Sequence, residues 1–170
     1  KYFNRLYPDG EFGLAFTDPE FTEFFANFSC DETVNQDDLD DRTRMMAILA
    51  ALLGCQGIDE FREVLPGALN LGVTPVEIKE IVYQACAYLG IGRVRPFFDA
   101  VNEVLTEKGV ALPLEGQATT TIEDRVEKGE QAQVDIFGEG MKEAWKNGHI
   151  NRWLAANCFG DYYTRTGLDL

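Results

Sequence analysis

The sequence predicts an all-α protein. Apolar residues recur at spacings of three and four over successive segments, as on the buried face of a helix. Two of these segments start with a capping residue followed by Pro, and four end at Gly, as helices commonly do. No segment shows the two-residue alternation of a half-buried strand.

The N-terminal part predicts one short helix between irregular segments. Residues 1–18 contain Gly, Pro and Asp and are expected to be mostly irregular. A helix should begin at Pro19 with Asp18 as its cap, since four phenylalanines follow at helical spacing. Residues 31–41 are expected to form a solvated loop. A calcium loop is the alternative, but the glycine and glutamate of an EF-hand are out of register. The acids of this loop are Asp31, Glu32, Asp37, Asp38, Asp40 and Asp41.

Residues 40–54 and 58–71 predict two core helices. The first carries a broad Met/Ile/Leu face and ends at Gly54. The second ends before Gly72 and has Pro66 in its interior. Because proline lacks an N–H and clashes with the preceding turn, we expect a bend or break near residues 62–66.

Two further helices follow with clear termini. Thr74 caps the first of them, Pro75 takes its first position, and Glu77 completes a capping box before the helix ends at Gly90. The next helix is expected over about 93–108, with Gly109 as its stop.

The remaining residues predict a linker and two more helices. Residues 110–120, "VALPLEGQATT", have the composition of a linker. Thr121, with Asp124 as its partner, should cap a helix that runs to about residue 137, and a last short helix should cover about 149–157.

The composition excludes several classes of partner. The net charge is −14, from 29 acidic and 15 basic residues, which argues against nucleic acid and against an anionic membrane surface. The longest apolar run, "MMAILAALLG" at 45–54, is too short to span a bilayer. The first residue is Lys1 and not Met, so the sequence leaves open whether a targeting segment has been removed.

The cysteines predict free thiols. The chain has four, with no Cys-x-x-Cys pair, and a single histidine, so a zinc site is not expected. We predict buried, reduced cysteines in a cytoplasmic protein, without metal or cofactor.

The chain also suggests an internal repeat. At an offset of 129 residues, segment 24–41 lies over segment 153–170. Ala26, Leu39 and Asp40 then match Ala155, Leu168 and Asp169, and Phe24 falls on Trp153. The shared order of helix, aromatic loop and Leu-Asp indicates a second copy of one unit.

Three stretches resemble the carboxymuconolactone decarboxylase family, which is related to the alkyl hydroperoxidase D proteins. They are "LDDRTRMMAILAALLG" at 39–54, the segment 66–105 that begins "PGALNLGVTPVEIKEIVYQACAYLG", and "FGDYYTRTGLDL" at 159–170. The resemblance implies an alkyl hydroperoxidase D-like helical bundle with a central antiparallel helix pair, and a homo-oligomer, commonly a trimer or hexamer. The expected organisation is one unit at 1–110, a linker at 111–121 and the first helices of an incomplete second unit at 122–170.

The catalytic positions of this family do not match. Its peroxidase branch has Arg-Glu on the first core helix, then Cys-x-x-Cys, then a His eight residues before the glycine that ends its helix. The decarboxylase branch generally keeps the Glu and the His. Neither the Glu nor the His is present here, so the first unit is predicted to be catalytically silent. Counted from Gly72, the His position holds Val64, the cysteine positions hold Glu60 and Gly57, and the Glu position after Arg44 holds Met45.

Three functions therefore stay open. The first is a small-molecule decarboxylase of the lactone or carboxylate type whose site lies in the second unit. The second is a non-catalytic scaffold or helper subunit. The third, with weaker support, is a peroxidase-like antioxidant protein. Arg42 and Arg44 could hold a substrate carboxylate in a bidentate fork, with a helix-terminal charge network as the alternative. Cys86 and His149 are the remaining candidates; the alternatives are a core thiol and a surface imidazole.

Overall fold

The computed structural model describes residues 2–7, 12–36, 38–146 and 148–168. Its regular elements are all helices, with no strand in these ranges, so the predicted all-α class is confirmed. Asp37 of the acidic loop, and Asp169 with Leu170 at the end of the repeat, lie outside the described residues.

The first 36 residues are more helical than expected. They contain α1 (Tyr2–Leu6), α2 (Pro19–Asn27), the π-helix η1 (Phe28–Glu32) and the short 3₁₀ helix η2 (Val34–Gln36). The sequence predicts irregular structure for α1 and a loop for much of η1 and η2, which is wrong. Tyr2 and Leu6 are buried, and α1 packs on α4. This burial outweighs the turn-forming composition of the segment.

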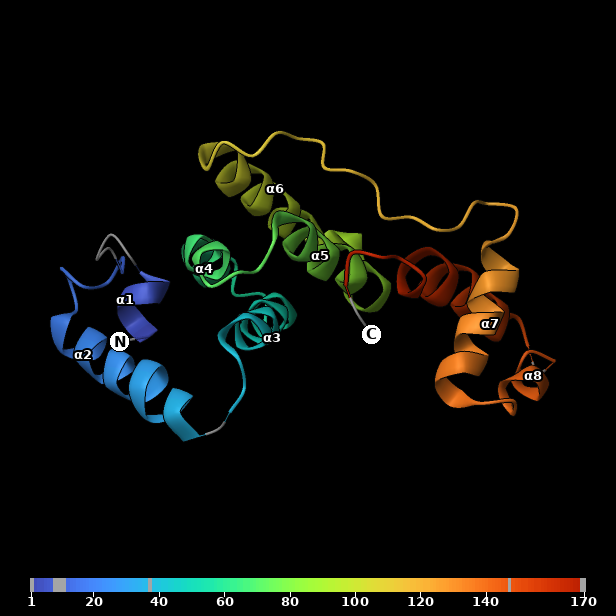
Figure 1. Cartoon of the computed structure of the whole chain (residues 1–170), viewed down its shortest axis with the longest axis horizontal. Helices are drawn as coiled ribbons and strands as arrows, with labels where there is room; N and C mark the ends of the chain where they lie inside the picture. The colour runs from blue at the N-terminus through green and yellow to red at the C-terminus, as the bar shows by residue number, and fades with distance from the viewer. Residues whose placement is uncertain (1, 8–11, 37, 147, 169–170) are drawn as a thin grey trace.

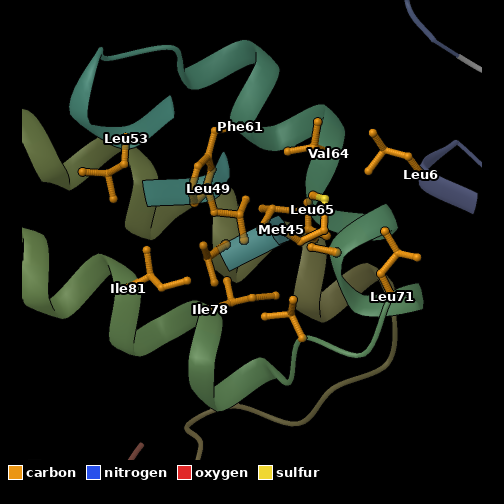
Figure 2. Packing of buried hydrophobic residues seen from close by; sticks show 14 of the residues in the cluster. Leu6, Met45, Leu49, Leu53, Phe61, Val64, Leu65, Leu71, Ile78 and Ile81 are labelled. Atoms are coloured by element: carbon orange, nitrogen blue, oxygen red, sulfur yellow. The ribbon is translucent and has the colours of Figure 1, made fainter. Parts of the chain in front are cut away.

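A central bundle holds the hydrophobic core. It consists of α3 (Asp41–Gly54), α4 (Ile58–Asn70), α5 (Pro75–Leu89) and α6 (Ile91–Glu107), which pack on one another. Figure 2 shows Met45 and Leu49 of α3 lying between α4 and Ile78 of α5. The expected capping box of Thr74 with Glu77 is confirmed, whereas the side chain of Asp18 makes no capping hydrogen bond to α2. At the start of α3, Thr43 N donates to Asp40 over 2.9 Å.

Pro66 does not break α4. The helix runs from Ile58 to Asn70 without interruption, so the expected break is wrong. Phe61, Val64, Leu65 and Ala68, on both sides of the proline, are buried in the core. The packing of this face holds the helix together at the cost of one backbone hydrogen bond.

The C-terminal part forms a second group of helices. Residues 110–121 carry no regular structure, and α7 (Arg125–Phe137), α8 (Met141–Ala144), α9 (His149–Trp153) and the π-helix η3 (Leu154–Tyr163) follow. The cap of α7 is Asp124, three residues later than predicted, and Thr121 N donates to Asp124 Oδ1 over 2.6 Å in the turn before the helix. Figure 1 shows this group at one end of the molecule, with the segment after η3 returning to α5.

Two glycines allow α7 and η3 to touch. A Cβ atom built on Gly129 would lie 1.9 Å from the carbonyl oxygen of Ala155, and one built on Gly160 would lie 2.1 Å from the carbonyl oxygen of Arg125. No side chain fits into either space. The α7–η3 pair therefore depends on backbone contact at these two positions.

The large apolar side chains of the second group are not hidden within this chain. A truncated unit is expected to bury them against residues outside 117–170, either in the first unit or in a neighbouring chain, yet Ile136, Phe137, Trp153 and Leu154 are exposed here and Trp145 is half-buried. Burial against the first unit is therefore wrong, and burial against a neighbouring chain stays a prediction. Some correspondence to the first unit exists nevertheless. At an offset of 129, η1 falls on residues 157–161, inside η3. The assignment of an incomplete second unit stays a prediction.

Replacing Gly129 by Ala should destabilise the α7–η3 pair. The added methyl overlaps a backbone oxygen, and overpacking of this kind costs about 1–3 kcal/mol. Urea unfolding followed by tryptophan fluorescence reports on this part of the chain, since both tryptophans, Trp145 and Trp153, lie in it. Gly140→Ala is the matched control, because Gly140 has a helical φ of −58° and nothing within 4 Å of its Cβ position. Equal midpoints for the two variants would contradict the close contact.

Candidate functional site

A cavity of about 500 Å³ lies where four segments of the chain meet. α5 contributes Lys79, Glu80 and Tyr83, and α6 contributes Asn102. The other walls come from residues 112–117 of the linker and from Arg165, which follows η3. We call this cavity the Lys79 pocket. Its volume lies in the usual range for small-molecule sites.

A buried ion pair forms one wall of the Lys79 pocket. Glu80 is only 2 % exposed, and its two carboxylate oxygens accept hydrogen bonds from Arg165 Nε and Nη2 over 2.7 and 2.8 Å. The guanidinium carbon also lies 5.1 Å from the centre of the Tyr83 ring, which adds a cation–π contact. The hydrogen bonds with Glu80 raise the pKa of Arg165. The two charges therefore satisfy each other fully.

Gly167 permits this ion pair. A Cβ atom at this position would lie 2.3 Å from Cγ of Glu80 and 3.0 Å from Val76. Thr166 N, one residue earlier, donates to the carbonyl oxygen of Gln117 over 3.1 Å. The segment 164–168 is thus fastened both to α5 and to the linker, and it closes one side of the pocket.

Lys79 is the cation that Glu80 does not neutralise. In the part of the chain that the structure describes it makes no ion pair, and its Nζ donates to the neutral side-chain oxygen of Asn102. Partial burial lowers the pKa of Lys79, because desolvation disfavours the ammonium form. Val76, Leu112, Pro113 and Leu114 supply apolar walls nearby. The pocket can therefore hold a small molecule with an acidic group at Lys79 and an apolar body beside the linker.

Two of the four positions expected to correspond to the family's catalytic residues are part of the core. Met45 is fully buried and Val64 nearly so, and neither can transfer a proton. The Tyr2 hydroxyl donates to Met45 Sδ over 3.1 Å, and burial raises the pKa of this tyrosine to about 12. α1 therefore covers the place where the acid of the family would stand. Glu60 is the ionisable residue of this set, and burial raises its pKa.

Arg42 and Arg44 each serve the protein's own structure. Arg42 forms an ion pair with Glu77, whose other oxygen accepts from Thr74 N over 2.8 Å in the capping box. Arg44 Nη2 donates to the carbonyl oxygen of Leu39 over 2.8 Å. These contacts match the helix-terminal charge network that was the alternative to a substrate fork.

Cys86 and His149 do not share a site. The Cys86 thiol contacts the carbonyl oxygen of Val82 one turn earlier, and burial raises its pKa. His149 is exposed at the start of α9, in the second group of helices. No group of three or more His, Cys, Asp or Glu side chains within the described ranges is placed to hold a metal ion. Nor is any described helix long and apolar enough to cross a membrane.

The residues of the Lys79 pocket were not singled out from the sequence. One local feature pointed to a buried Glu80: it lies between Ile78 and Ile81, two residues of the buried face of α5. An acid on such a face needs a cation, but Arg165 is 85 positions away and no local spacing could identify it. Lys79 and Asn102 carried no indication at all, because exposed helices commonly contain both residue types.

The fold and the comparisons together define the class of this protein. Residues 19–103, which include most of the central bundle, match the model of the carboxymuconolactone decarboxylase family, and the chain belongs to this family. It is similar to a 4-carboxymuconolactone decarboxylase from Acinetobacter baylyi, with 29 % identity over 92 residues, 54 % of this chain and 69 % of the relative. A search of the solved structures gave no match.

Replacing Arg165 by Met should loosen the segment 164–168. The change leaves Glu80 buried without a partner, and breaking a buried pair typically costs about 3–5 kcal/mol. Undocking of the segment relieves this cost, so the Thr166 amide, which donates to Gln117, should exchange its hydrogen at least about tenfold faster.

The double variant Glu80→Leu/Arg165→Met should restore slow exchange, because no buried charge remains. Arg125→Met is the control: it removes the partly exposed pair with Asp161 and leaves Glu80 paired. Unchanged exchange at Thr166 in Arg165→Met would show that the ion pair does not hold the segment.

Proposed function

We propose that this protein binds a small carboxylate in the Lys79 pocket and that its 19–103 unit does not carry out the decarboxylation for which the family is named. The observation that carries the proposal is Lys79, a partly buried ammonium with only a neutral partner at the wall of a 500 Å³ cavity. In a chain of net charge −14, such a cation concentrates acidic ligands locally. The relative's name supports this class of ligand, since 4-carboxymuconolactone bears a carboxyl group.

The absence of catalysis in this unit is supported by Met45 and Val64. Both are apolar and buried where the family's acid and base are expected. The Tyr2 hydroxyl also contacts the sulfur of Met45. A decarboxylase site in a second unit remains the alternative for the whole protein. A cytoplasmic location is part of the same proposal, in keeping with four cysteines that form no disulfide.

A thiol peroxidase is the least supported alternative. Burial raises the pKa of Cys30 to about 11 and raises the pKa of Cys86 and Cys158 as well. Since the thiolate is the species that attacks a peroxide, these shifts act against the reaction. Cys55 is exposed, but no second cysteine that could act as a resolving thiol lies near it in the sequence.

Lys79→Met should weaken carboxylate binding about tenfold or more, since a hydrogen bond to a charged group contributes about 1.5–3 kcal/mol. Calorimetric titration with adipate, a flexible dicarboxylate, measures this. Lys108→Met is the matched control, because Lys108 is exposed at the end of α6 and away from the pocket. Lys79→Arg should retain part of the affinity.

The same proteins should release no carbon dioxide from 4-carboxymuconolactone. Equal adipate affinity in wild type and Lys79→Met would contradict the assignment of the pocket. Absence of binding to all of these proteins would favour the scaffold alternative, and carbon dioxide release by this chain would contradict the silent unit.

A further inference from the structure

Two short helices carry large exposed apolar side chains at equivalent places of the repeat. On α2, Phe21 and Phe24 are 52 % and 61 % exposed; on α9, Ile150 and Trp153 are 69 % and 64 % exposed. The offset of 129 residues places Phe21 on Ile150 and Phe24 on Trp153. We call these pairs the α2 stripe and the α9 stripe. Apolar surface of this kind usually marks a place of contact.

The chain's own core does not cover the α2 stripe. Phe25, next to Phe24 in sequence, packs against the hydrophobic cluster of the central bundle. Phe21 and Phe24 remain open although α3, α4, α5 and α6 are all in place. No helix of the central bundle therefore covers these two side chains.

Two hollows lie at the α9 stripe. Trp153 stands between two hollows, of about 450 and 340 Å³. Ile150 and Leu154 line the first, and Ile122 and Val126 line the second. α2 presents two phenylalanines one helical turn apart, a spacing that two neighbouring hollows can accept.

The charges around the two stripes are opposite. α2 has Glu20 and Glu23 and no basic residue, whereas α9 has Arg152 and His149 and no acidic residue. The repeat offset places Glu23 on Arg152, so the charge is reversed at the same position of the unit. Both side chains are exposed. Such complementarity orients two surfaces and selects the partner.

We propose that α2 of one copy of this chain docks on α9 of a second copy. Phe21 and Phe24 enter the hollows beside Trp153, and Glu23 lies next to Arg152. Figure 1 shows α2 and the α7–α8 region, from which α9 continues, at opposite ends of the molecule. Two copies in antiparallel arrangement therefore make the contact twice and close the assembly. Aromatic residues and arginine are the residue types that dominate the energy of such interfaces.

Sedimentation velocity over a range of about 1–100 µM tests this contact, because association depends on protomer concentration. Wild type should sediment as an oligomer at the upper end of the range. Glu23→Arg and Arg152→Glu should each weaken association about tenfold or more, since each places like charges opposite one another. The double variant Glu23→Arg/Arg152→Glu should recover the wild-type behaviour.

Two control variants separate the contact from net charge. Glu107→Arg and Lys108→Glu make the same changes in charge at exposed positions near the end of α6, and both should associate as wild type does. A wild-type chain that stays at 19.1 kDa over the whole range would overturn the proposal. So would controls that weaken association equally, or a double variant that does not recover.

Discussion

The pair of Glu80 and Arg165 joins the C-terminal segment of the chain to the central bundle. Glu80 is buried on α5, where an isolated carboxylate would be very costly, so its position requires the cation that arrives from the far end of the chain. Between Glu80 and Arg165 the chain forms the linker, α7 and η3, and the segment after η3 then lies against α5 (Figure 1). The return is possible only because Gly167 leaves room for the Glu80 side chain.

The chemical character of the Lys79 pocket follows from this pairing. With Glu80 and Arg165 satisfied by each other, the neighbouring Lys79 is left as a cation without a charged partner, in a cavity whose lining also includes the exposed Glu115 of the linker. The linker residues Leu112, Pro113 and Leu114 supply an apolar part of the wall. Residues 112–117 and Arg165, which lie outside the 19–103 family match, therefore help to shape the candidate site. With Met45 and Val64 at the positions expected to be catalytic, we propose that the Lys79 pocket is the ligand site of this scaffold.

The sequence predicted the helices of the central bundle because their determinants are local. The caps at Asp40 and Thr74 and the stop at Gly90 lie within a few residues of the helix ends they define. The sequence-based prediction failed where contacts between distant parts of the chain determine the local structure. α1 is helical because it packs on α4, and α4 continues through Pro66 because both sides of the proline are buried. The candidate site was less predictable still, since its ion pair spans 85 positions, and the candidate arginine Arg42 proved to hold Glu77.

The ionisation of Lys79 tests the central claim most directly. Carbon-13 NMR of the lysine Cε resonances, assigned with a Lys79→Arg variant, gives the pKa of this side chain with and without adipate. The structure predicts a pKa below that of an ordinary lysine in the free protein, because the ammonium is partly desolvated beside a neutral partner. A bound carboxylate stabilises the ammonium, so the pKa should rise when adipate is added. An ordinary pKa that adipate leaves unchanged would contradict the claim that Lys79 is the anchor of a carboxylate site.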